Sequence, residues 1–224
     1  EFWTGVTSTL KNPRALPRLI KGFTEFRKEA REDMNWNKQR VRNRLARRHK
    51  KYLENLRELF TATSEKVGAG KMLVDSSKSP EQALALALIP EIKLYALNLT
   101  RDPRAVTISW AKRNDDVAFL KGRAKEWRKR QRLMGYFEGF EGTEFKLLRY
   151  EDLTADPRGT IENVLKWTGH NASTENFSAA DAASVTWDDL HLFAPINEGV
   201  LKARATDITI KPADSWKDLK NKDI

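Results

Sequence analysis

The spacing of hydrophobic residues predicts that the first third of the chain is helical. Apolar side chains recur at intervals of three and four from residue 16 to residue 30, and again from residue 36 to residue 67. This period is that of amphipathic α-helices with one buried face. Glycines at positions 68 and 70 are expected to end the second helical stretch. The apolar positions that mark the buried sides are Leu19, Ile20, Phe23, Phe26, Val41, Leu45, Tyr52, Leu56, Leu59 and Phe60.

After residue 70, short apolar runs alternate with helical patterns. Residues 71–75, 92–99 and 145–150 are expected to form buried strands. The predicted helices begin at Pro80 with Ser79 as N-cap, at Pro103, near Asp116 and after Tyr150. Strands that alternate with helices predict an α/β fold with a parallel sheet flanked by helices. Ligands of such sheets bind beyond the carboxyl ends of the strands, so the residues that follow each run are candidates for a site.

The composition favours an anionic partner and argues against a metal site and a membrane span. The chain has 41 Lys and Arg against 31 Asp and Glu, a formal charge of +10, which favours an anionic partner. It has no Cys, and its three His do not have metal-ligand spacing, so a metal site is not expected. No apolar run approaches the roughly 18 to 20 residues that span a bilayer, so no membrane span is expected in this segment.

The most basic stretch runs from Lys38 to Lys51, inside the second predicted helical stretch. Such a run is usually the solvated face of a helix, and we favour that interpretation. Basic helices also contact nucleic-acid phosphates, with a steep dependence on salt. A basic nucleic-acid-binding module is therefore the alternative function.

Three polar clusters follow the predicted strands. They are Asp75-Ser76-Ser77-Lys78-Ser79-Pro80, then Arg101-Asp102-Pro103-Arg104-Ala105-Val106 with Ser109 eight residues after Arg101, and then Arg149-Tyr150-Glu151-Asp152-Leu153. A guanidinium group and a hydroxyl near one strand end can bind the same anion. In this order, the clusters resemble the sulfotransferase family, most closely its carbohydrate- and bacterial-type branches. The resemblance is best over residues 71–169 and implies a P-loop-like fold.

The resemblance implies that 3′-phosphoadenosine 5′-phosphosulfate is the sulfuryl donor, and the composition gives no reason to expect a metal beside it. Arg101 and Ser109 match the pair that binds the donor's 3′-phosphate, and Arg204 and Lys202 lie where relatives place further basic residues on it. Tyr150 matches the aromatic position near the nucleotide, although an aromatic side chain there can also simply pack the strand end. These five residues are the predicted cofactor-binding set.

Three further residues are candidates for catalysis. Lys78 matches a residue close to the transferring sulfonate, where a cation offsets charge on the leaving oxygen; an ordinary exposed loop lysine is the alternative. Glu1 resembles an acidic residue that accepts the acceptor's proton in some members, and His191 is the rival base. The motif around His191 matches imperfectly, and a structural role is the interpretation we favour for it. Glu151 and Asp152 are expected to cap the next helix and to hold Arg149.

The family's Gly-rich phosphate loop does not occur in these 224 residues. We therefore expect a partial, N-terminally truncated sulfotransferase domain over residues 1–224, without its first strand and phosphate loop, and inactive by itself. Residues 14–67 are a candidate acceptor-binding insertion. The acceptor is expected to carry a hydroxyl or an amine, with an anionic saccharide or another small molecule as candidates, and no nucleic acid is expected. Compartment stays open between the cytoplasm of a bacterium and the Golgi lumen of a eukaryote, as does oligomeric state.

Overall fold

The computed structural model describes residues 6–8, 10, 15–68, 70–111, 117–170, 173–184 and 206–218. It is an α/β structure with helices and a small parallel sheet. The chain divides into two compact units. Unit 1 contains Glu1–Asn98 and Arg128–Lys146, and unit 2 contains Leu99–Trp127 and Leu147–Ile224.

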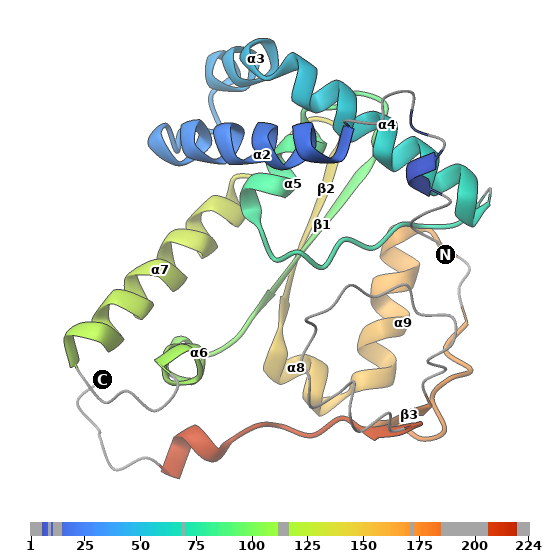
Figure 1. Cartoon of the computed structure of the whole chain (residues 1–224). Helices are drawn as coiled ribbons and strands as arrows, with labels where there is room; N and C mark the ends of the chain where they lie inside the picture. The colour runs from blue at the N-terminus through green and yellow to red at the C-terminus, as the bar shows by residue number, and fades with distance from the viewer. Residues whose placement is uncertain are drawn as a thin grey trace. The chain divides into compact units, whose positions relative to one another are not determined.

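The elements follow one another along the chain as Figure 1 labels them. The helices are α2 (Ala15–Glu32), α3 (Gln39–Arg48), α4 (Lys50–Val67), α5 (Pro80–Ala87), α6 (Pro103–Ala111), α7 (Val117–Gly135), α8 (Tyr150–Ala155), α9 (Pro157–Thr168) and the 3₁₀ helix η1 (Ser215–Asp218). The strands are β1 (Leu94–Thr100), β2 (Thr143–Arg149), β3 (Ala182–Ser184) and β4 (Asp207–Thr209). β1 pairs with β2, and β3 pairs antiparallel with β4.

The core of unit 1 is built from the apolar faces of α2 to α5. Phe26, Leu45 and Leu84 are fully buried in it, as the hydrophobic spacing predicts for the first two. The prediction is wrong for Ile20, which is 71% exposed. Trp36 is also fully buried, and its indole N–H donates to the carbonyl oxygen of Ala30 at 2.9 Å, so its polar atom is satisfied inside the core. Figure 1 shows α2 lying beside α3, α4 and α5. These contacts fix the helices that surround the cavity described below.

Several predicted elements are confirmed with small changes. The stretch predicted over residues 36–67 is two helices, because His49 leaves the helical conformation at φ −105° and ψ 22° and separates α3 from α4. Ser79 caps α5 as predicted, with its hydroxyl accepting the Gln82 N–H at 3.2 Å. The helix predicted after residue 150 is divided at Asp156, whose carboxylate caps α9 by accepting the Gly159 N–H at 3.0 Å.

The strand predicted over residues 71–75 is wrong. The structure assigns no strand to this segment, and Val74, which the pattern would bury, is 86% exposed. A strand requires a ladder of backbone hydrogen bonds to a neighbour, and this segment makes no such ladder with the described residues. The segment is therefore an extended approach to α5.

Candidate functional site

The cluster that follows β1 begins with an arginine that has no carboxylate partner among the described residues. The nearest acid in sequence, Asp102, is bound to Arg104: its carboxylate accepts the Arg104 backbone N–H at 2.8 Å and Nη2 at 2.7 Å. The hydrogen bond from Arg104 lowers the pKa of Asp102. Asp102 thus caps the start of α6, but it does not neutralise Arg101. The guanidinium of Arg101 remains available to another anion.

Arg101 is held in place by neutral groups. Its guanidinium carbon lies 4.4 Å from the centre of the Tyr150 ring, a cation–π contact, and Nη2 donates to the carbonyl oxygen of Ala213. The Tyr150 hydroxyl accepts the Ala213 N–H at 3.2 Å and lies 3.4 Å from the carbonyl oxygen of Lys211. Tyr150 therefore joins the end of β2 to residues 211–213 and positions Arg101 at the same time.

Glu151 ties the second cluster to the third. One of its carboxylate oxygens accepts the backbone N–H of Asp102 at 3.0 Å, a contact that the sequence did not reveal. Glu151 and Asp152 also lie 3.9 Å from the Arg149 guanidinium, so the expected pairing is confirmed, in the form of two loose ion pairs. Both motifs belong to unit 2, so this link supports the geometry around Arg101.

Ser109 lies in α6 and is exposed, and its hydroxyl makes no hydrogen bond with another described residue. The structure shows no direct contact between Ser109 and Arg101. Trp216 is half-buried and lies against the guanidinium of Arg104, with 4.8 Å between that group and the ring centre. Its indole therefore packs on a surface cation.

Lys78 lies in unit 1, at a cavity of about 500 Å³. It is exposed, and its φ of 60° places it in the left-handed region, which costs a non-glycine residue roughly 1–2 kcal/mol. Such strain persists where the surrounding structure imposes it, often at functional sites. The cavity is lined by Phe23, Arg27, Arg31, Asp75, Ser77, Lys78, Ser79, Pro80, Glu81, Gln82 and Arg130.

A buried ion pair forms one wall of this cavity. The Glu81 side chain is 2% exposed, and its carboxylate accepts the Arg31 Nε–H at 2.5 Å and the Ser79 hydroxyl at 2.9 Å. Burial raises the pKa of Glu81, but the hydrogen bonds from Arg31, the backbone and Ser79 outweigh it and leave the pKa lowered. Glu81 is therefore a carboxylate at neutral pH, and it offsets the charge of Arg31.

Sequence reasoning missed the arginines of the cavity. Phe23, Arg27 and Arg31 follow one another at intervals of four on α2, so they lie on one face of that helix. That spacing is visible in the sequence, but nothing in it shows that α2 faces the loop before α5. Arg130, on α7, could not be connected to them without the fold.

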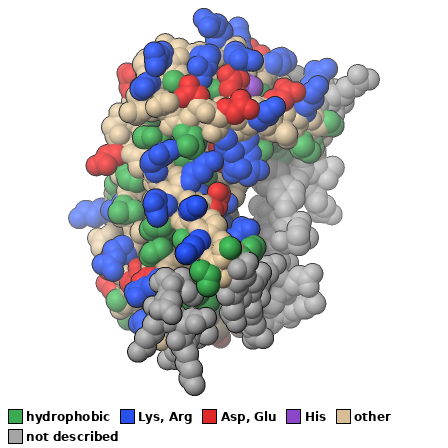
Figure 2. All heavy atoms as spheres, turned by 90° about the vertical axis from the view of Figure 1, so that its left-hand side faces the viewer, with side chains coloured by type: hydrophobic (Ala, Val, Ile, Leu, Met, Phe, Trp, Pro, Cys, Tyr) green, Lys and Arg blue, Asp and Glu red, His purple; other side chains and the backbone are tan. Residues whose placement is uncertain are grey.

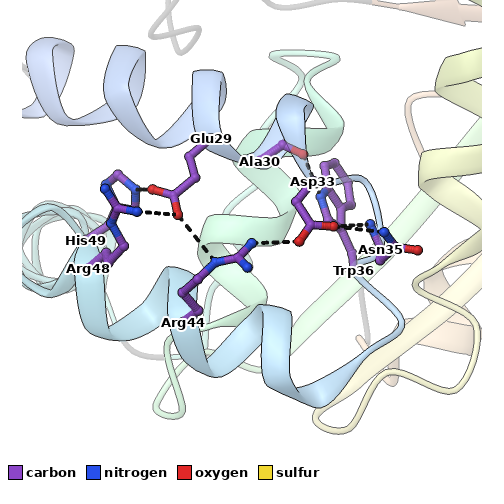
Figure 3. A network of polar contacts seen from close by, with 8 residues as sticks. All are labelled: Glu29, Ala30, Asp33, Asn35, Trp36, Arg44, Arg48 and His49. Carbon is purple, nitrogen blue, oxygen red and sulfur yellow. Dashed lines mark hydrogen bonds and ion pairs between the residues drawn. The ribbon is translucent and has the colours of Figure 1, made fainter.

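The basic run from Lys38 to Lys51 folds against acidic residues of unit 1. Figure 3 shows Arg44, Arg48 and His49 pointing towards Glu29 and Asp33. Arg44 Nη2 lies 2.7 Å from an Asp33 oxygen, and His49 Nε2 lies 2.9 Å from a Glu29 oxygen. The hydrogen bond from Arg44 is the main reason that the pKa of Asp33 falls to about 2. Acidic side chains of the same unit thus neutralise part of the positive charge of this run.

The other predicted site residues, Glu1, His191, Lys202 and Arg204, lie outside the described residues. Within the residues that the structure does describe, no group of three His, Asp or Glu side chains could hold a metal ion. In that same part of the chain, none of the helices combines the length and the hydrophobicity needed to cross a bilayer.

Arg101 is thus a fixed arginine after a strand of an α/β chain, without a carboxylate partner among the described residues. The sequence model of the sulfotransferase family matches residues 4–174. The chain belongs to the sulfotransferase family, so the predicted family is confirmed. No curated protein and no solved structure matches the chain.

Proposed function

We propose that this protein transfers a sulfuryl group from 3′-phosphoadenosine 5′-phosphosulfate to a hydroxyl, or an amine, of an acceptor. The observation that carries the proposal is the state of Arg101, which is fixed by Tyr150 and the Ala213 carbonyl while Asp102 is bound to Arg104. A pre-positioned guanidinium without a carboxylate partner is suited to a phosphate, which it can bind through two parallel N–H groups.

Arg101 and Ser109 are the proposed ligands of the donor's 3′-phosphate, and Tyr150 is the proposed aromatic neighbour of the nucleotide. The support for Tyr150 is its double role, since its ring lies against Arg101 and its hydroxyl holds residues 211–213. Lys202 and Arg204 are proposed as further cations for the same phosphate, on the basis of the family resemblance alone.

The proposed reaction is an in-line displacement at sulfur. The acceptor oxygen forms a bond to sulfur while the bond from sulfur to the phosphate oxygen breaks, and adenosine 3′,5′-bisphosphate leaves. The acceptor's proton passes to a general base, for which Glu1 and His191 are the candidates. Lys78 is proposed to offset the negative charge that develops on the leaving oxygen, and its strained backbone supports a functional constraint at this position.

A P-loop-like fold is part of this proposal. In that fold, backbone amides of a glycine-rich loop bind the donor's 5′-phosphosulfate, and the 224 residues contain no such loop. We propose that residues 1–224 are part of one sulfotransferase domain and that residues 14–67 contribute to acceptor binding. The cavity beside α2 supports the second point.

The test is calorimetric binding of adenosine 3′,5′-bisphosphate to the protein and two variants. Arg101→Ala is expected to weaken binding by about 10- to 100-fold, because a charge-assisted hydrogen bond contributes roughly 1.5–3 kcal/mol. Arg149→Ala is the matched control: Arg149 is 62% exposed and lies at the end of the neighbouring strand. Its binding should stay within about threefold of the parent.

Adenosine 2′,5′-bisphosphate provides a ligand control, since only the position of one phosphate differs. Arg101 should distinguish the two isomers, and Arg101→Ala should lose that preference. Equal affinity of the parent and Arg101→Ala for the 3′,5′ isomer would refute the proposed donor site.

A further inference from the structure

The cavity of unit 1 contains more positive than negative charge. Its cationic side chains are Arg27, Arg31, Lys78 and Arg130, and its carboxylates are Asp75 and Glu81. Many Lys and Arg side chains are visible on the face of the molecule that Figure 2 presents, in keeping with the formal charge of +10. The cavity differs from a merely basic surface because it is concave and has an apolar wall.

Both carboxylates of the cavity already have partners. Glu81 is bound to Arg31 at 2.5 Å, and Asp75 accepts the Ser77 N–H at 2.8 Å. Arg27 and Lys78 are exposed, and neither forms an ion pair with a described residue. The Glu81 carboxylate offsets the Arg31 guanidinium, and Arg27 and Lys78 together outweigh Asp75, so the site stays net positive and suits an anion.

Phe23 supplies the apolar wall. Its ring lines the cavity, one helical turn from Arg27 on the same face of α2, and is supported from behind by Tyr52 with ring centres 6.4 Å apart. An aromatic ring next to a cation suits a ligand that carries a ring and an anionic group together, because the ring packs while the charge is bound.

We propose that this cavity binds the acceptor through an anionic group, a carboxylate or a sulfate ester. Arg27 contacts that group, and the ring of the acceptor packs on Phe23. The inference rests on the proposed function: Lys78, the proposed neighbour of the transferring sulfonate, lines the same cavity, and an acceptor hydroxyl has to reach that sulfonate. The acceptor on this proposal carries a ring and an anionic group, unlike a neutral phenol, and an acidic saccharide is the class we propose.

The test uses two pairs of probes that differ in charge and share their ring. One pair is 4-nitrophenyl β-D-glucuronide and its methyl ester, and the other is N-acetylglucosamine 6-sulfate and N-acetylglucosamine. Calorimetry or NMR titration at low salt should show at least one anionic probe binding about 10-fold more tightly than its neutral partner. Arg27→Met should remove most of that preference.

Arg18→Met is the matched control, because Arg18 is exposed on the same helix and does not line the cavity. It should keep the preference. Equal binding within both pairs, or the same loss in Arg18→Met, would overturn the inference. Displacement of the anionic probe by adenosine 3′,5′-bisphosphate would also overturn it, by assigning the cavity to the donor.

The two proposals can fail separately. Loss of charge preference with intact, Arg101-dependent bisphosphate binding removes the acceptor site and leaves the donor site. An Arg27-dependent preference without any bisphosphate binding supports the anion site and refutes the sulfotransferase role proposed for it.

Discussion

The buried ion pair between Arg31 and Glu81 should contribute more to the free energy of unfolding than the exposed ion pair between Arg57 and Glu91. A comparison of these two pairs isolates the effect of burial. Glu81 and Glu91 each bind one arginine, at 2.5 Å to Arg31 and at 2.7 Å to Arg57. The Glu81 side chain is 2% exposed, whereas that of Glu91 is 57% exposed. Replacing each by Gln removes the same charge from two different surroundings.

The expected magnitudes follow from burial. Breaking a fully buried pair costs about 3–5 kcal/mol. Arg31 is 35% exposed and can turn to solvent, so we expect Glu81→Gln to cost about 2–3 kcal/mol of the free energy of unfolding. Exposed pairs contribute about 0–1 kcal/mol, and Glu91→Gln should fall in that range. For a chain of this size, 1 kcal/mol corresponds to roughly 2–4 °C in melting temperature.

Urea unfolding followed by circular dichroism, with thermal melts as a second measurement, would compare the two variants with the parent. Glu81→Gln also frees Arg31 at the cavity, so its affinity for the anionic glucuronide should rise while its stability falls. Equal losses of stability in Glu81→Gln and Glu91→Gln would refute the argument from burial. Unchanged stability in Glu81→Gln would show that the carboxylate is not held as described.

Two further predictions concern glycines of α2 and α7 and the acidic network of unit 1. Gly22→Ala should lower the free energy of unfolding, because the added Cβ would lie 2.9 Å from Tyr52 Cβ. Such overpacking costs about 1–3 kcal/mol, which exceeds the gain in helix propensity of about 0.5–1 kcal/mol. Gly122 has open space around it in α7, so Gly122→Ala should raise the free energy of unfolding by about 0.5–1 kcal/mol. If both substitutions changed the free energy of unfolding in the same direction, the contact described between Gly22 and Tyr52 would be contradicted. The pKa of Asp33 is lowered from 3.8 to about 2, so its ion pair with Arg44 stabilises the fold fully above pH 3.8 and is lost as pH falls towards 2. Urea titrations between pH 5 and pH 2.5 should show a shallower fall in Asp33→Asn, and parallel curves would contradict the pairing.

The sequence predicts helices better than it predicts the sheet. Hydrophobic spacing of three and four residues finds α2, and cap residues such as Ser79 locate helix starts, because both signals are local. A strand depends on a partner far away in the chain. Residues 71–75 have the composition of a buried strand, and yet the described residues give them no hydrogen-bonding ladder.

The sequence also predicts the residues of the candidate site better than it predicts the contacts between them. Arg101, Tyr150 and Lys78 could be selected from motifs, because residue type and order carry the resemblance. The contact between Glu151 and the Asp102 N–H, and the meeting of Tyr150 with residues 211–213, join segments far apart in sequence. No spacing rule connects such segments, so only the fold could reveal them.

The density of basic residues in the sequence is a poor guide to which cations lack an acidic partner in the fold. The run from Lys38 to Lys51 is the most basic, yet Arg44 and His49 within it are bound to Asp33 and Glu29. Arg101 stands beside an aspartate in the sequence, and that aspartate is occupied by Arg104 instead. Whether a cation is available to an anionic ligand therefore depends on which acidic side chain the fold brings next to it. By that criterion the positions to test are Arg101 in unit 2 and Arg27 in unit 1, since neither has a described carboxylate partner.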